Sequence, residues 1–137
     1  MTVTANDLKQ LVAKAAEARL QAYAPYSGYP VGAALLAGSG MMYRGANVEN
    51  AAYPSSMCAE RAALFHAVSN GERELLAIAV VTENGGTPCG ACRQVLSEFG
   101  LDALVVIAMP DGKILLETTV RGLLPHSFGP GKLPGNP

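Results

Sequence analysis

The placement of three cysteines constrains this chain more than any other feature of its sequence. Cys58 stands alone, Cys89 and Cys92 follow as a C-x-x-C pair, and the 137-residue sequence contains no others. Three thiolates can hold a zinc ion and leave its fourth tetrahedral position for water, as a catalytic zinc requires. We therefore expect one Zn²⁺ per subunit, and a fold that brings the two cysteine motifs together.

Composition narrows the class of protein. Only 15% of the residues are charged, against about 25% in a typical domain, which is consistent with a surface partly buried in an oligomer or with a merely neutral surface. The net charge of −1, with scattered basic residues, argues against nucleic-acid and membrane partners. Because the sequence shows neither a signal peptide nor a long apolar run, we expect a cytoplasmic protein.

Hydrophobic periodicity and turn residues predict alternating strands and helices in a single domain over 1–137. The predicted helices cover 7–23, 58–70, 90–99 and a turn near 121–125, and the predicted strands cover 31–37, 41–48, 75–81, 104–109 and 114–120. Short links make the first two strands and the last two strands antiparallel hairpins. Strand–helix–strand units over 41–81 and 75–109 predict parallel neighbours. The expected fold is α/β, with three layers and a five-stranded mixed sheet flanked by helices.

Both cysteine motifs then lie at helix N-termini, where an open α/β sheet binds ligands. Glu60 is two residues from Cys58 and is the candidate catalytic residue, which moves protons at the zinc-bound water. Residues two apart point to different sides of a helix, so this role requires the helix to begin at Cys58.

Three thiolates and a hydroxide give a zinc site an excess of negative charge. Helix N-termini lower thiol pKa values and offset part of this charge. Arg61 lies one helical turn from Cys58 and is the predicted neutralising cation, and Arg93, next to Cys92, is a second candidate.

Two other interpretations of the cysteines remain. Cys89 and Cys92 are spaced like a redox dithiol, although Cys58 and Glu60 have no role in that scheme. A structural zinc needs a fourth ligand, for which the sequence offers His66 and His126. His66 is about 12 Å along the helix from Cys58, too far to share an ion, whereas His126 stays open.

The metal motifs and two further segments closely resemble the small cytidine deaminases. The resemblance runs from about Tyr23 to Phe128. It rests on the following segments: Tyr26-Ser27-Gly28-Tyr29-Pro30-Val31-Gly32-Ala33-Ala34, Asn47-Val48-Glu49-Asn50-Ala51, Cys58-Ala59-Glu60-Arg61 and Pro88-Cys89-Gly90-Ala91-Cys92-Arg93-Gln94. It implies hydrolytic deamination of cytidine and 2′-deoxycytidine to the uridines plus ammonia, in pyrimidine salvage.

The same resemblance implies the substrate contacts. Asn47 and Glu49 match residues that bind the ribose hydroxyls, and Tyr29 occupies the place of an aromatic residue, usually Phe, that packs on the base. Tyr53 and Phe128 match residues contributed across subunit contacts, and Ala59 completes the predicted substrate-binding set. A cysteine as first ligand is typical of the homotetrameric group.

Two related activities compete with this interpretation. Deaminases of blasticidin S share the cysteine motifs, but we expect no ribose-binding glutamate in them at the position of Glu49. Polynucleotide editors have parallel last strands, whereas the turn at Pro110-Asp111-Gly112-Lys113 allows only a hairpin. A structural-zinc or redox module is the remaining, non-enzymatic alternative.

Overall fold

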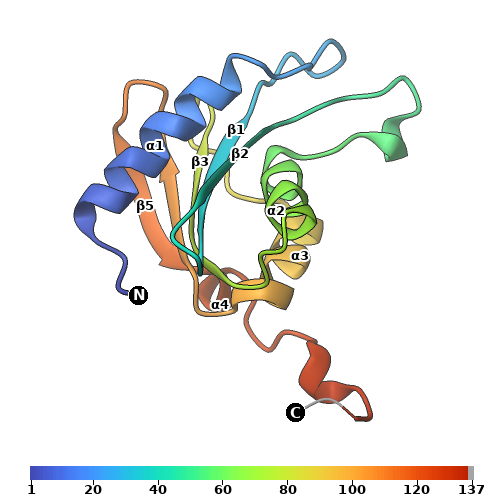
Figure 1. The fold of residues 1–137 in the computed structure, drawn as a ribbon. Coiled ribbons are helices and arrows are strands. Elements are labelled where there is room, and N and C mark those ends of the chain that lie inside the picture. Colours follow the sequence, from blue (N-terminus) through green and yellow to red (C-terminus); the bar gives the residue numbers. More distant parts are fainter. Residues whose placement is uncertain (136–137) are drawn as a thin grey trace.

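The computed structural model describes residues 1–135, which form one five-stranded mixed sheet covered by helices on both faces (Figure 1). The helices are α1 (Ala5–Arg19), α2 (Ala59–Ser69), α3 (Gly90–Gly100) and α4 (Val120–Leu123). The strands are β1 (Gly32–Ala37), β2 (Met42–Ala46), β3 (Leu75–Val81), β4 (Leu104–Ala108) and β5 (Ile114–Thr119). The predicted fold class is confirmed. None of the helices within 1–135 is both long and apolar enough to cross a bilayer.

The order of the strands corrects one prediction. The sheet runs β2-β1-β3-β4-β5, so β3 and β4 are parallel neighbours as expected. The expectation that the strand over 41–48 lies beside the strand over 75–81 is wrong, because β1 pairs antiparallel with both β2 and β3. All six residues of β1 are buried, whereas β2 carries the exposed Arg44, which suits an edge strand better than a central one.

Each face of the sheet has its own core. Alternate residues of a strand point to opposite faces, and β1 accordingly sends Leu36 toward α1 and Leu35 toward α2 and α3. Figure 1 shows α1 alone on one side of the sheet and α2 with α3 on the other. The two cysteine motifs belong to the α2 and α3 side.

The first helix is shorter than predicted at its C-terminal end. Thr4 and Asp7 form the expected capping box, in which each side chain accepts a hydrogen bond from the other residue's backbone N–H. The helix ends at Arg19 rather than at Tyr23. The Tyr23 backbone instead donates to Asn47 O at 2.9 Å and accepts from Glu49 N at 2.8 Å. This bridge between distant segments draws the chain out of the helix and anchors the loop that contains Tyr29.

The absence of a side chain at Gly45 allows α2 to lie directly on β2. A Cβ built there would be 2.4 Å from Ala63 N and 2.7 Å from Ala59 O, so Gly45→Ala must push the backbone of α2 away. Forced overpacking of this kind costs about 1–3 kcal/mol. We expect thermal denaturation to show a Tm several degrees below wild type.

The matched control is Gly129→Ala. A Cβ at Gly129 meets nothing within 4 Å, and its extended backbone accepts any residue, so the Tm should not change. Equal melting of G45A and G129A would contradict the close packing of α2 on β2.

Candidate metal centre and substrate cavity

The two cysteine motifs meet at the N-terminal ends of α2 and α3. Cys58 is the N-cap of α2, with an extended backbone (φ −72°, ψ 151°), and Cys89 is the N-cap of α3. Cys92 lies in the first turn of α3 and is buried. The predicted start of the helix at Cys58 is confirmed, and the three cysteines come from the two neighbouring helix ends that the sequence predicts.

The spacing of the sulfur atoms fits a zinc ion. Cys58 Sγ is 3.9 Å from Cys89 Sγ, Cys89 Sγ is 3.5 Å from Cys92 Sγ, and all three lie within 4.8 Å of one another. Ligands held tetrahedrally at about 2.3 Å from zinc are about 3.8 Å apart. Three sulfur donors with this spacing therefore suit Zn²⁺ and leave one coordination position free.

The ionisation of the thiols supports this fit. Hydrogen bonds from Cys92 and Arg61 lower the pKa of Cys58 to about 5, whereas the bond to the Cys58 thiolate and burial raise the pKa of Cys92. The thiol cluster thus holds one negative charge readily and resists the loss of further protons. A divalent cation that binds thiolates provides the charge needed to remove them.

Arg61 is the cation that the structure places at the cluster. Its Nη2 donates to Cys58 Sγ at 3.3 Å, and the nearby thiolates raise the arginine pKa. Its Nε is buried without a partner among the described residues. The prediction that Arg93 is a second neutralising cation is wrong, because its nitrogens donate to Pro88 O, Leu123 O and Thr87 Oγ1 rather than to a thiol. Arg93 instead ties the loop before Cys89 to the C-terminal segment.

Replacing Arg61 with Gln should weaken metal binding. Outer partners of metal ligands typically contribute about 10–100-fold to affinity, and a neutral Gln leaves the excess thiolate charge uncompensated. We expect R61Q to lose zinc to a competing chelator at correspondingly lower chelator concentrations. The control, Arg121→Gln, removes an exposed arginine that pairs with Asp102. If R61Q and R121Q retain zinc equally, Arg61 does not neutralise the site.

Glu60 is buried beside the thiols. Its side chain is 5% exposed, it lines the same cavity as Cys58 and Cys89, and burial together with the Cys58 charge raises its pKa to about 7, against the opposing effect of Arg61. A carboxyl group with a pKa near 7 both accepts and returns a proton at neutral pH. The side chain therefore has the position and proton affinity of a general acid–base.

The cavity in front of the cysteines has a volume of about 310 Å³. It brings together most of the predicted site residues from loops far apart in the sequence. They are Tyr29, Asn47, Glu49, Cys58, Ala59, Glu60 and Cys89, joined by Ser27, Val31, Val80, Thr82, Gly86 and Thr87. Sequence reasoning did not assign these last six residues a role, although Ser27 and Val31 belong to the segments that carry the resemblance.

The predicted ribose ligands hold the loop over residues 26–31. Asn47 Nδ2 donates to Tyr29 O at 3.0 Å, and Asn47 Oδ1 accepts from Val31 N at 2.8 Å. Glu49 accepts hydrogen bonds from the Ser27 hydroxyl and from the backbone N–H groups of Ser27 and Tyr26. The bond from the Ser27 hydroxyl, followed by the backbone bonds, lowers the Glu49 pKa. Glu49 is thus an ionised acceptor at the cavity wall.

Two predicted substrate residues lie outside this cavity. Tyr53 is 70% exposed and lines a separate hollow with Tyr26, whose ring centroid is 5.7 Å away. Phe128 is 58% exposed, and its carbonyl accepts from Gln94 Nε2. Figure 1 shows the C-terminal segment projecting away from the sheet. The cavity of one chain therefore does not include these two aromatic rings.

The histidines do not join the cysteine cluster. The grouping of possible metal ligands at this site, as far as residues 1–135 show, consists of the three cysteines alone. His66 packs edge-on against Tyr43, with ring centroids 5.3 Å apart. His126 is exposed on the C-terminal segment, at a positive φ of 55°. A structural zinc completed by either histidine thus has no support in the described residues.

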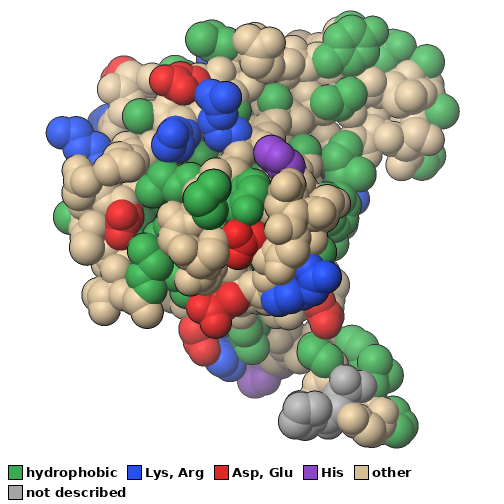
Figure 2. Space-filling view, in the orientation of Figure 1, with side chains coloured by type: hydrophobic (Ala, Val, Ile, Leu, Met, Phe, Trp, Pro, Cys, Tyr) green, Lys and Arg blue, Asp and Glu red, His purple; other side chains and the backbone are tan. Residues whose placement is uncertain are grey.

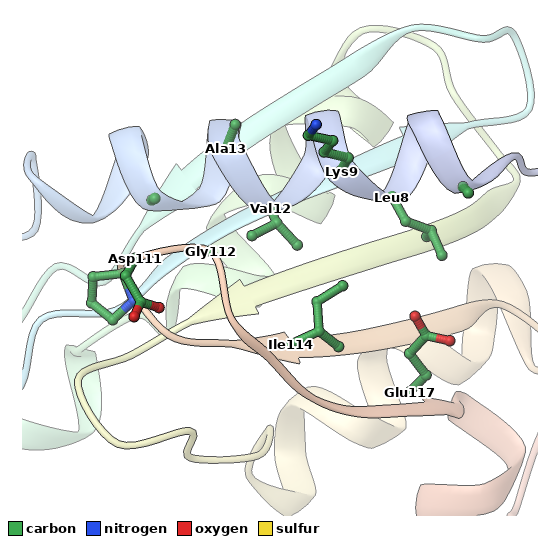
Figure 3. A pocket seen from close by; sticks show the side chains of 11 residues that line it. Leu8, Lys9, Val12, Ala13, Asp111, Gly112, Ile114 and Glu117 are labelled. Atoms are coloured by element: carbon green, nitrogen blue, oxygen red, sulfur yellow. The ribbon is translucent and has the colours of Figure 1, made fainter.

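A larger cavity lies on the opposite face of the sheet. It has a volume of about 740 Å³ between α1 and the turn that joins β4 to β5 (Figure 3). Its lining is mostly apolar and includes the charged residues Lys9, Asp111 and Glu117. It contains none of the cysteines, so size alone would point to the wrong site.

Comparison with known proteins identifies the family. Residues 5–108 match the family model described as the cytidine and deoxycytidylate deaminase zinc-binding region. The chain is 50% identical over 124 residues to the cytidine deaminase of Sporosarcina psychrophila, which covers 89% of this chain and 91% of that protein. It is also 50% identical to the enzyme of Halalkalibacterium halodurans, over 89% of this chain and 94% of the relative.

Solved structures agree with the sequence comparison. The cytidine deaminase of Burkholderia pseudomallei superposes with a TM-score of 0.84 at 44% identity and covers 92% of this chain and 100% of its own. The cytidine deaminase of Mycobacterium tuberculosis gives 0.77 at 39% identity, over 90% and 98%. Cys58 and Cys89 of the triad line one cavity with Glu60. Together with this geometry, the matches show that the chain belongs to the zinc-binding cytidine deaminase family.

Proposed function

We propose that this protein catalyses the hydrolytic deamination of cytidine and 2′-deoxycytidine to uridine and 2′-deoxyuridine, with release of ammonia. One observation carries the proposal: the ionisable Glu60 shares a cavity with Cys58 and Cys89, two members of a cysteine triad spaced for zinc. The relatives named cytidine deaminases support the choice of substrate. We also propose that residues 1–137 act as a single deaminase domain.

In this mechanism the three cysteines would hold the metal, and Arg61 would neutralise part of their charge. Cys58, Cys89 and Cys92 would bind Zn²⁺, which would supply a water of lowered pKa to the cavity. Arg61, bonded to Cys58 Sγ, limits the negative charge that would otherwise oppose deprotonation. The positive ends of α2 and α3 act in the same direction.

Glu60 moves the protons. Its carboxylate takes a proton from the attacking water and gives it to the ring nitrogen next to the amine-bearing carbon. A second proton passes through Glu60 to the amino group, which leaves as ammonia, and the carbon gains the oxygen of water. A pKa of about 7 allows Glu60 to act as base and then as acid in one turnover.

The ribose and base contacts are the next part of the proposal. Asn47 and Glu49 lie at the cavity wall and offer an amide and an ionised carboxylate to the sugar hydroxyls. In the structure both side chains form hydrogen bonds with the backbone of residues 26–31. The same side chains would therefore bind the sugar and hold the loop beside it. The Tyr29 ring packs on the base, and Ala59 lines the cavity between Cys58 and Glu60.

We further propose a homotetramer that works in the cytoplasm, in pyrimidine salvage. Aromatic side chains that stay exposed on one chain support the assembly, since a monomer would leave them in water. They include Tyr23, Tyr26, Tyr53 and Phe128. Figure 2 shows hydrophobic side chains gathered on the projecting loops at the upper right. In a tetramer, Tyr53 and Phe128 would complete the site of a neighbouring subunit.

Light scattering after size-exclusion chromatography should give four times the subunit mass.

A substrate panel tests the proposed activity. Purified zinc-loaded protein is mixed separately with cytidine, 2′-deoxycytidine, adenosine and blasticidin S, and ammonia release is followed. We expect release from the two cytosine nucleosides alone. Release from blasticidin S only would reassign the substrate, and release from none would refute a deaminase of these compounds.

A further inference from the structure

The loop between β3 and α3 folds around one buried hydroxyl group. Thr82 is 2% exposed, and its Oγ1 accepts hydrogen bonds from Gly85 N and Gly86 N, each at 2.8 Å. The loop continues through Thr87 and Pro88 directly to Cys89. It therefore forms one wall of the cavity and also leads into the metal cluster.

Tyr29 reaches across to this loop from a distant part of the sequence. Its hydroxyl donates to Asn84 Oδ1 at 2.6 Å, and its carbonyl accepts from Asn47 Nδ2 at 3.0 Å. The residue is thus held at both its backbone and the tip of its ring. Tyr29 and Gly86 line the same cavity, so the hydrogen bond to Asn84 joins two walls of the site.

Gly86 provides the space that the Tyr29 hydroxyl needs. A Cβ built at Gly86 would be 2.5 Å from Tyr29 Oη, whereas the next ring atoms are 3.6 and 3.8 Å away. The close approach therefore involves the hydroxyl oxygen alone. A phenylalanine ring in the same position would leave room for a methyl group at residue 86.

We propose that Tyr29, Asn84 and Gly86 form a clasp across the substrate cavity, in which Asn84 and Gly86 are positioning residues that hold the Tyr29 ring ready for the nucleoside base. This inference rests on the proposed function, in which Tyr29 packs on the base. A ring and a loop that are already ordered lose less conformational freedom when the ligand binds. The clasp therefore improves substrate binding and leaves the proton transfers through Glu60 unchanged.

A double-mutant cycle tests the hydrogen bond. Tyr29→Phe and Asn84→Ala each remove one partner, and each should raise the KM for cytidine by about fivefold, as expected for one hydrogen bond, while kcat stays within about twofold. Because both variants break the same bond, the double variant should also show a rise of about fivefold, rather than the roughly 25-fold product expected of independent sites. The dissociation constant of the product uridine, measured by calorimetry, should follow the same pattern.

The matched control is Tyr43→Phe. Tyr43 donates its hydroxyl to Glu72 Oε2 at 2.8 Å, so the substitution removes a comparable hydrogen bond away from the cavity, and KM should stay at the wild-type value. Multiplying effects in the Tyr29 and Asn84 cycle, or an unchanged KM in both single variants, would overturn the clasp.

Gly86→Ala provides a second test, in which the second substitution should rescue the first. In the wild-type background the new methyl group must displace the Tyr29 hydroxyl, so we expect KM to rise at least tenfold and Tm to fall. Adding Tyr29→Phe removes the clash, so G86A/Y29F should recover the KM and Tm of Y29F alone. If the second substitution rescues neither quantity, Gly86 does not serve the Tyr29 hydroxyl.

The two proposals fail in different ways. Wild-type protein that releases no ammonia from cytidine refutes the proposed function, whereas the Tm rescue of G86A by Y29F still tests the clasp. Wild-type turnover together with uncoupled variants refutes the clasp alone.

Discussion

Glu60→Gln should fold, bind zinc and lose nearly all turnover. Gln has the shape of Glu but cannot accept and return a proton, and general acid–base catalysis typically contributes about 10²–10⁴-fold. Because Glu60 serves both proton transfers, we expect kcat for cytidine to fall by about 10³-fold or more. Steady-state kinetics and zinc analysis on the same preparation measure the two expectations together.

The raised pKa of Glu60 also predicts the direction in which E60Q changes stability. Burial raises the pKa of Glu60 to about 7, so the folded protein binds this proton more tightly than the unfolded chain. The free energy of unfolding therefore falls as pH rises from the ordinary glutamate range through about 7, because the folded protein must give up this proton. E60Q removes this cost and should melt no lower than wild type at neutral pH, which excludes unfolding as the cause of lost activity.

Glu98→Gln is the matched control for E60Q. Glu98 is exposed on α3, so the same chemical change there should leave kcat unaltered. Turnover of E60Q within roughly tenfold of wild type would show that another group moves the protons, since a loss that small falls below the range of general acid–base catalysis.

Removal of the metal should have the second large effect. All three cysteines of the chain belong to the cluster, so thiol reactivity reports the site without background. Zinc-loaded protein should react slowly with a thiol reagent. After chelation, three thiols should react, activity should vanish and Tm should fall, because a ligand that binds only the folded state stabilises it.

Adding zinc back separates metal loss from damage. Wild-type protein should regain activity and thiol protection, whereas Cys89→Ala should regain neither. The exposed Asn70→Ala, on the surface beyond α2, should behave as wild type. Full activity in protein shown by elemental analysis to be free of metal would contradict a catalytic zinc.

Local sequence patterns predicted the metal centre well because its geometry depends on local structure. An N-cap residue has an extended backbone just before a helix, and Cys58 and Cys89 both have it. That single fact places their side chains at helix ends and lets Glu60 share the site with Cys58. The capping box of Thr4 and Asp7 was predicted for the same reason, because both residues belong to one helix end.

The remaining features could not be predicted from the sequence because they depend on contacts between segments that are far apart in it. The insertion of β1 between β2 and β3 follows from burial over the whole sheet, which no segment reveals alone. The early end of α1 follows from the Tyr23 bridge to Asn47 and Glu49. The partner of the Tyr29 hydroxyl lies 55 residues away at Asn84, and no pattern around either residue indicates the pair.

The isotope content of the product tests the central claim most directly. Cytidine is incubated with zinc-loaded protein in water enriched in oxygen-18, and the mass of the uridine formed is measured by mass spectrometry. Unlabelled uridine kept under the same conditions controls for exchange of oxygen with the solvent. The proposed hydrolysis predicts uridine with one heavy oxygen at the former amine position and one ammonia per uridine. Unchanged cytidine, or uridine without the label, would contradict a deaminase that uses water at this cavity.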